Sequence, residues 1–213
     1  MVTHYMVSLD LNNRKCLVVG GGKIAERKVR SLLECGAQVY VVSPEIIPSL
    51  LSMVAEGSLI YRRGSYKISD LEDMFLVFGA TGKEEINKQI ASDCASRNLI
   101  VNIVDDPAKC NFYVPAVVRR GALSIGISTC GKSPLLARKI REELELVYGP
   151  QYGDFLEMLG ALRKKVIRDI SDPERKKKKL EDLVSDEILN MLKKGGFDPV
   201  KEMLLSAYNG SRS

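Results

Sequence analysis

Short apolar runs alternate with amphipathic stretches through the first half of the chain. The runs lie at residues 15–19, 39–42, 59–61, 75–78 and 99–104. Between most of them the apolar residues recur at helical spacing, most clearly over residues 24–35 and 84–97. Nearly continuous apolar strands separated by helices are typical of a parallel sheet with both faces covered. The pattern therefore predicts a doubly wound α/β domain over residues 1–112.

The pattern changes near residue 112. Two strand-like segments, 112–118 and 123–128, are joined by a short turn with no helix between them. The second segment alternates apolar and small polar residues, which suits either a half-exposed sheet or a sheet completed by another subunit. Ser133 and Pro134 then provide an N-cap and a first-turn proline for a helix that should end near Val147. We expect a small α+β segment over residues 113–148.

Residues 149–213 carry apolar positions at helical spacing, so we expect a helical C-terminal domain there. Within it, the consecutive cations of residues 175–179 are typical of a solvated helix face. We expect residues 209–213 to be disordered.

The composition narrows the classes of function. The 213 residues are 45% hydrophobic and 28% charged, and no apolar stretch approaches the roughly 18 residues of a membrane helix. The start of the chain lacks the basic residues and apolar core of a signal peptide, so we expect a cytoplasmic protein. A net charge of +5 favours an anionic small molecule and does not indicate nucleic acid. We therefore expect neither a nucleic acid nor a membrane as partner.

The cysteines are scattered, and no C-x-x-C pair occurs. With 5 cysteines and 1 histidine, the chain offers neither a disulfide framework nor the usual ligands of a resident metal site, and we expect no metal cofactor. We expect Cys16 and Cys94 to be small core residues.

A glycine-rich turn follows the first predicted strand. Gly20 permits the tight turn, and Gly22 lets the backbone approach a pyrophosphate without a Cβ in the way. Ala25 is small enough for the following helix to pack on the strand, and the helix N-terminus offers free N–H groups to phosphates. Lys23 and Ile24, at the crest of the loop, should lie closest to the dinucleotide. This spacing of small residues is typical of a dinucleotide-binding turn in a Rossmann-type domain. The alternative is a glycine-rich turn that binds no ligand.

The adenosine ribose of a dinucleotide should lie where the second strand ends. Ser43, Pro44 and Glu45 follow that strand, and Ser43 or Glu45 could bond the ribose hydroxyl. We expect no arginine beside Ser43 to accommodate a 2′-phosphate, which favours NAD over NADP. After the fourth strand, Thr81 lies among small residues that would let the chain pass close to the cofactor.

Asp105 follows the fifth strand. An acid at the carboxyl end of a Rossmann strand faces the place where nicotinamide and substrate meet. Asp105 is therefore a candidate general base or substrate anchor, and the alternative is a loop aspartate that caps the turn before Pro107.

Several segments resemble the dehydrogenase module of siroheme synthase, also called precorrin-2 dehydrogenase. Residues 17–28 (LVVGGGKIAERK) resemble the opening of that module. Residues 80–81, 102–105 and 127–134 agree with it in order and spacing, as do Ala137 and Arg138. The resemblance is strong over roughly residues 8–150 and weak over the helical tail. The Glu-Arg-Lys after the glycine turn and the Ser-x-x-Gly-x-Ser-Pro segment are much more specific than the glycine turn.

The resemblance implies NAD-dependent oxidation of precorrin-2 to sirohydrochlorin, and some members also insert ferrous iron to give siroheme. The resemblance also implies a homodimer whose subunits exchange strands and helices after the Rossmann domain. Residues 113–148 would then be a dimerisation segment. The family's key aspartate corresponds to Asp105, with Asp106 as second choice. A serine phosphorylated in a bifunctional relative corresponds to Thr129, which puts such regulation in doubt. A methyltransferase domain that follows this module in bifunctional members is not expected here, because the sequence ends at Ser213.

Precorrin-2 carries many carboxylates, so its site should offer cations and free N–H donors. The segment after the Rossmann domain supplies candidate substrate-binding residues: Arg119, Arg120, Lys132, Ser133 and Arg138, with Arg141 nearby. Tetrapyrrole nitrogens would ligate any iron, with Asp105 helping to remove their protons.

Two other functions fit the glycine turn. The regulatory domains of potassium transporters are also Rossmann units, and they bind a nucleotide without catalysis. An NAD-dependent dehydrogenase of a small hydroxy acid would normally place a histidine or lysine in its cleft, and His4 is poorly placed for that.

Overall fold

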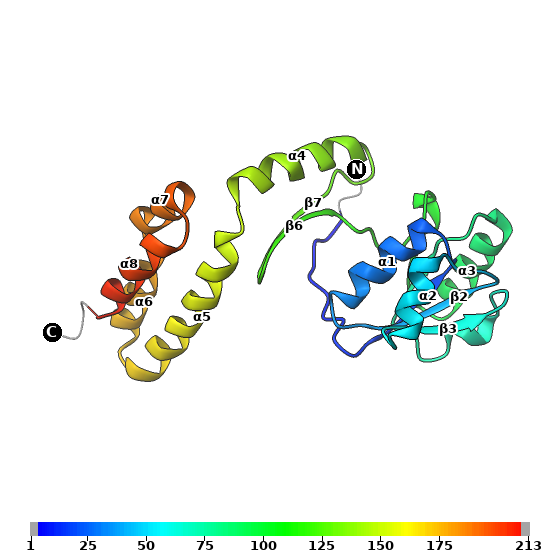
Figure 1. Cartoon of the computed structure of the whole chain (residues 1–213), viewed down its shortest axis with the longest axis horizontal. Helices are drawn as coiled ribbons and strands as arrows, with labels where there is room; N and C mark the ends of the chain where they lie inside the picture. Colours follow the sequence, from blue (N-terminus) through cyan, green and yellow to red (C-terminus); the bar gives the residue numbers. More distant parts are fainter. Residues whose placement is uncertain (1–3, 210–213) are drawn as a thin grey trace. The chain divides into compact units, whose positions relative to one another are not determined.

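The computed structural model describes residues 4–209 of the chain. Its contacts divide the chain into two compact units, with the boundary between Val114 and Pro115. Each unit is described by itself (Figure 1). The disorder expected for residues 209–213 is not tested beyond Asn209, which ends a helix, because residues 210–213 lie outside the described part.

The first unit contains a five-stranded parallel sheet in the order β3-β2-β1-β4-β5. Its strands are β1 (Lys15–Val19), β2 (Gln38–Ser43), β3 (Ile60–Arg63), β4 (Leu76–Gly79) and β5 (Ile100–Ile103). Its helices are α1 (Lys23–Leu33), α2 (Pro48–Ala55) and α3 (Glu84–Ser96), with short 3-10 turns η1 (Ile68–Leu71) and η2 (Pro107–Lys109). The predicted Rossmann-type sheet is confirmed.

Alternate residues of β1 face two different cores. Cys16 and Val18 pack in a cluster with α1 and α2, whereas Leu17 and Val19 pack in a cluster with α3. Because successive side chains of a strand point to opposite faces, a strand buried on both sides must be apolar throughout. This explains the continuous apolar runs of the sequence.

The buried cysteines are core residues, as expected. Cys16 and Cys94 have no exposed surface. Burial raises the pKa of Cys16 to about 11 and that of Cys94 to about 12. Both side chains therefore stay protonated thiols at neutral pH.

The second unit begins with an antiparallel hairpin of β6 (Ala116–Arg120) and β7 (Leu123–Ile127). Five helices follow: α4 (Pro134–Val147), α5 (Gln151–Asp169), α6 (Pro173–Asp182), α7 (Asp186–Gly195) and α8 (Asp198–Asn209). The hairpin turn packs closely on α5, since a Cβ on Gly121 would lie 3.2 Å from the Cα of Gly153. The hairpin and helices match the predicted order, while the division of this unit into a dimerisation segment and a helical domain stays a prediction.

The cation run 175–179 lies on α6, and its last member differs from the prediction. Lys179 is buried, and its ammonium donates a hydrogen bond to the carbonyl of Ala207 near the end of α8. A cation at a helix C-terminus satisfies carbonyls that lack intrahelical partners. The run is therefore a solvated face with one buried anchor.

Candidate dinucleotide site and active site

The glycine turn connects β1 to α1 at the carboxyl edge of the sheet. Gly20 has a φ of +131°, and a Cβ there would lie 2.3 Å from the carbonyl oxygen of Ala80. Its N–H donates to the carbonyl of Val42, at 2.9 Å. No residue with a side chain fits this place, because β4 passes directly beside the turn.

Gly21 is also required, although the sequence pattern leaves its position open. A Cβ on Gly21 would lie 2.0 Å from the carbonyl oxygen of Glu45. The N–H of Ile47 donates to the Gly21 carbonyl at 2.9 Å, which fixes the loop after β2 on the glycine turn. Three successive glycines were the available signal for this contact.

Gly22 leaves open space at the start of α1. Nothing lies within 4 Å of the place where its Cβ would be, and this N-cap residue has no side-chain capping bond. The first N–H groups of a helix have no intrahelical partner. A pyrophosphate fits this cradle, in which the first-turn N–H groups and the helix dipole would hold it. Lys23 and Ile24 are exposed there, and their contact with the dinucleotide stays a prediction.

Ser43 ends β2 and is buried. Its carbonyl accepts a hydrogen bond from the Tyr61 hydroxyl at 2.9 Å. Arg63, the last residue of β3, is its partner in the parallel register, and Arg63 Nε donates to the Pro44 carbonyl at 3.2 Å. The expectation that no arginine lies beside Ser43 is therefore wrong, because the neighbouring strand supplies one that sequence proximity cannot reveal.

Thr81 lies in the turn before α3. Its hydroxyl accepts from the Lys83 N–H at 3.2 Å and donates to Asn87 Oδ1 at 2.7 Å. Asn87 Nδ2 donates back to the Thr81 carbonyl at 3.0 Å. These bonds hold the segment that approaches Gly20, and contact of Thr81 with a cofactor stays a prediction.

Asp105 is exposed at the carboxyl edge, after β5, with a φ of +61°. Its carboxylate makes no hydrogen bond within the described part of the chain. The 3-10 turn at Pro107 starts instead from Asp106, which forms an ion pair with Lys109 and makes no side-chain capping bond. The capping alternative for Asp105 is thus not what the structure shows. Its carboxylate is free to meet a substrate.

Lys28 is a residue of this edge that the sequence pattern did not single out. Its Nζ lies 4.8 Å from the centre of the Phe78 ring, a cation–π contact. Burial lowers the pKa of Lys28, Arg27 adds to this, and the neighbouring Cys110 and Asp105 oppose it. The Glu-Arg-Lys that follows the glycine turn was the available signal. The arrangement places a partly desolvated ammonium near Asp105.

His4 also lies closer to this edge than expected. Its ring stacks on that of Tyr113 with centroids 4.5 Å apart, and its buried Nδ1 has no hydrogen-bond partner. The Tyr113 hydroxyl donates to the Pro107 carbonyl at 2.9 Å. The only histidine of the sequence therefore packs against the segment that follows Asp105.

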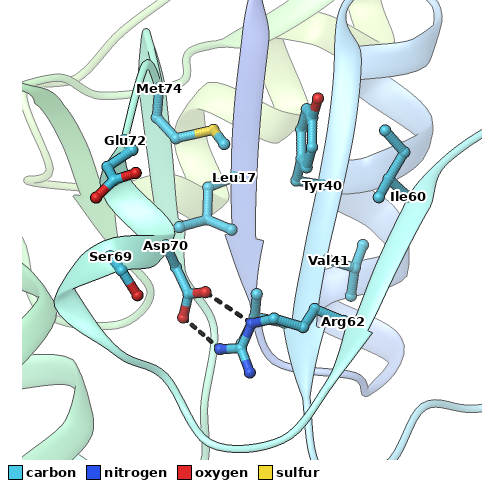
Figure 2. A pocket seen from close by; sticks show the side chains of 10 residues that line it. Leu17, Tyr40, Val41, Ile60, Arg62, Ser69, Asp70, Glu72 and Met74 are labelled. Atoms are coloured by element: carbon cyan, nitrogen blue, oxygen red, sulfur yellow. Dashed lines mark hydrogen bonds and ion pairs between the residues drawn. The ribbon is translucent and has the colours of Figure 1, made fainter.

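A pocket of the first unit is a separate feature. It has a volume of about 190 Å³ and lies over β2 and β3 on the face away from α1 (Figure 2). Leu17, Tyr40 and Met74 line it, and none of its residues was predicted as a site residue. Dinucleotides bind in open crevices at the carboxyl ends of strands, so this pocket is not the cofactor site.

The predicted substrate-binding cations lie in the second unit and differ in their contacts. Arg120 donates to the carbonyls of Tyr148, at 2.8 Å, and Glu145, at 3.3 Å. It ties β6 to the end of α4, and its part in substrate binding stays a prediction. Arg119 and Lys132 are exposed, and Arg138 is exposed with its guanidinium on Glu142 at 2.7 Å.

The loop before α4 is held by its own side chains. Ser133 Oγ accepts from the Leu136 N–H at 3.2 Å, which confirms the predicted N-cap. Thr129 Oγ1 accepts from the Ser133 N–H at 3.1 Å. Thr129 therefore orders the loop in its unmodified form.

Together, the strand order, the glycine turn and the uncapped start of α1 define a dinucleotide-binding Rossmann protein. Residues 7–116 match the sequence model of an NAD(P)-binding family. Residues 120–145 match the model described as sirohaem biosynthesis protein central. The second match lies outside the dinucleotide-binding unit, and the regulatory-domain alternative does not account for it.

Individual relatives agree with these matches. Siroheme synthase 3 of Aeromonas hydrophila is 38% identical over 156 residues, which are 73% of this chain and 33% of that protein. The siroheme synthase of Methylobacillus flagellatus is 33% identical over 204 residues, which are 96% of this chain and 44% of that protein. A solved structure of SirC, a precorrin-2 dehydrogenase, has a TM-score of 0.80 at 32% identity and is matched over 98% of its chain and 96% of this one. The chain belongs to the family of siroheme synthases and precorrin-2 dehydrogenases.

The chain spans less than half the length of the two siroheme synthases, and nearly all of SirC. The predicted cofactor, NAD, is confirmed by the NAD(P)-binding match and the SirC likeness. Among the described residues, no helix is long and apolar enough to span a membrane.

Proposed function

We propose that this chain catalyses the NAD-dependent dehydrogenation of precorrin-2 to sirohydrochlorin. The observation that carries the proposal is the likeness to SirC, a precorrin-2 dehydrogenase, over 96% of this chain. The open cradle at Gly22 and the unpaired carboxylate of Asp105 are the local features that support it.

In this proposal, different residues of the first unit bind the cofactor, accept a proton and bind the substrate. Backbone N–H groups of the glycine turn and of α1 bind the pyrophosphate, and Ser43 or Glu45 bonds the adenosine ribose. Bound NAD supplies the acceptor for a hydride. Dehydrogenation also releases a proton, and a carboxylate oxygen of Asp105 accepts it. Lys28 offers its ammonium to a carboxylate of the substrate on the same edge.

The second unit contributes charge. We propose that Arg119, Lys132 and Arg138 contact carboxylates of precorrin-2, with the N–H groups after Ser133 as further donors. All three cations are exposed. The exposed leucines of α4, such as Leu146 at 87%, support the proposal of a homodimer through residues 113–148.

We also propose that ferrous iron is a second substrate. The proposed location of both reactions is the cytoplasm. Among residues 4–209 no cluster of histidine, cysteine and acidic side chains is suited to hold a metal ion. The tetrapyrrole nitrogens would therefore ligate the iron, and Asp105 would remove their protons. To test this second activity, ferrous iron is added to enzymatically formed sirohydrochlorin in the presence of the protein. The visible spectrum then shows whether iron is inserted.

A matched pair of aspartates tests the main activity. Asp105→Asn removes the proposed base, and Asp73→Asn makes the same change at a φ of +59°, close to the +61° of Asp105. Asp73 precedes β4 at the opposite edge of the sheet. We expect Asp105→Asn to lower kcat with precorrin-2 and NAD by about 100-fold or more. Asp73→Asn should keep wild-type turnover, and full activity of Asp105→Asn would contradict the assignment.

A further inference from the structure

We propose that Arg63 contacts the 2′ position of the adenosine ribose and lets the site accept a 2′-phosphate, so that the protein binds NADP as well as NAD. This inference rests on the proposed dinucleotide-binding function. It concerns a residue whose position reverses an expectation from the sequence.

Arg63 stands at the correct place in the sheet. It is paired in parallel register with Ser43, and both residues end their strands at the same edge. Neighbouring strands lie about 4.8 Å apart. In Rossmann domains the adenosine ribose lies beyond the end of β2, where a nearby arginine accommodates a 2′-phosphate.

The side chain of Arg63 turns toward the loop that leaves β2. Its Nε donates to the Pro44 carbonyl at 3.2 Å, and the residue is exposed. This one bond anchors the guanidinium and leaves both Nη groups with their donors available, since Arg63 makes no other side-chain bond within residues 4–209. A guanidinium with two neighbouring donors binds phosphate oxygens in pairs.

Arg62, the preceding residue of β3, has a structural role and differs from Arg63 in its contacts. Arg62 points to the other face, where Nε donates to Asp70 Oδ1 at 2.7 Å (Figure 2). Its Nη2 donates to the Ser65 carbonyl at 2.9 Å. Its charge is matched by a carboxylate. Arg63 has no such partner among the described residues, so its charge is free for an anion.

The charges around Ser43 also permit a phosphate. NAD-selective sites place a carboxylate at the end of β2, where it bonds the ribose hydroxyl and repels a 2′-phosphate. Here that position is the neutral Ser43. Glu45 lies two residues further along, with its backbone carbonyl held against Gly21. The carboxyl ends of β2 and β3 therefore offer the cation of Arg63. The nearest acid in the loop, Glu45, lies two residues after the end of β2.

Binding of cofactor fragments tests this without turnover. Isothermal titration compares ADP-ribose with 2′-phospho-ADP-ribose for the wild type, Arg63→Gln and Arg97→Gln. Arg97 lies at the opposite edge, after α3, so its variant removes the same charge elsewhere. We expect the wild type to bind both ligands, with Arg63→Gln weakening only the phosphorylated one by about tenfold or more. Arg97→Gln should bind both ligands like the wild type.

The other outcomes are distinct. If the wild type binds ADP-ribose but not 2′-phospho-ADP-ribose, the inference about Arg63 is overturned and the proposed function is not. Equal weakening of both ligands by Arg63→Gln also overturns it, because Arg63 would then only support the Pro44 loop. Failure of the wild type to bind ADP-ribose contradicts the proposed function as well.

Discussion

Lys28 carries a charge into a half-buried position near Asp105. Its ammonium packs on Phe78, and burial lowers its pKa, so part of its hydration is lost without a full ion pair in return. A desolvated charge of this kind lowers stability unless a ligand compensates it. We therefore propose that Lys28 serves to bind a ligand and not to pack the core.

Lys28→Met separates these two roles. Methionine keeps the apolar stem on Phe78 and removes the desolvated charge, so the melting temperature should stay unchanged or rise. The KM for precorrin-2 should rise about tenfold, because a cation facing a carboxylate is lost. Lys88→Met, at an exposed lysine paired with Glu84 at 2.8 Å, is the control and should keep KM. A lower melting temperature with unchanged KM would assign Lys28 to packing.

The buried thiols predict how stability depends on pH. Unfolded thiols ionise near pH 9.0, whereas the folded-state pKa values are about 11 for Cys16 and about 12 for Cys94. Between these values the folded state holds more protons than the unfolded state, so the free energy of unfolding falls as pH rises above 9.0. Urea unfolding on both sides of that pH should show a smaller decrease for Cys16→Ala/Cys94→Ala. An identical decrease in both proteins would refute this origin.

At the level of elements, the glycine turn joins β1, α1 and the loop after β2. Adjacent glycines serve different purposes there: Gly21 admits the Glu45 backbone, whereas Gly22 borders open space. We therefore expect stability to depend on Gly21 and binding of the dinucleotide, in the proposed site, to depend on Gly22. The two positions can therefore be tested with the same substitution.

Gly21→Ala should lower the free energy of unfolding by about 1–3 kcal/mol, because its Cβ would lie 2.0 Å from a carbonyl oxygen. Gly22→Ala, at an ordinary φ of −94°, should leave stability unchanged. Its added methyl enters the pyrophosphate cradle and should weaken ADP-ribose binding about tenfold or more. Chemical unfolding and titration of both variants measure this. A Gly22→Ala protein that binds like the wild type would remove the cradle from the site.

The element scale also shows what the sequence could predict. Strand periodicity and the Gly20–Gly22 spacing reveal local structure, and Asp105 follows a strand whose carboxyl end has a known direction. Arg63 was missed because its neighbour, Ser43, is 20 residues away, and the register of parallel strands depends on the helix packed between them. The environments of Lys28 and Arg120 could not be predicted for a related reason: they come from residues distant in sequence.

For the whole molecule, the two units carry different parts of the proposed reaction. The first provides the dinucleotide cradle and Asp105, and the second provides exposed cations and an apolar surface on α4. Leu135, Leu146 and Val147 are 64%, 87% and 49% exposed. We propose that these exposed apolar residues belong to an interaction surface, which is the basis of the proposed homodimer.

Light scattering after gel filtration tests the dimer. The native mass should be that of two chains of 23.6 kDa each. Leu146→Glu should shift it toward one chain, because a carboxylate cannot be buried unpaired in an apolar interface. Glu143→Gln is a nearby control that should stay dimeric. A wild-type mass of a single chain would refute the proposal.

The central claim is that this protein transfers a hydride from precorrin-2 to NAD. The most direct measurement is an anaerobic time course with both compounds, in which NADH and sirohydrochlorin are followed together by their absorbance. We predict that both appear in equal amounts, only when NAD and the protein are present. Sirohydrochlorin formation that does not depend on NAD, or no formation at all, would contradict the claim.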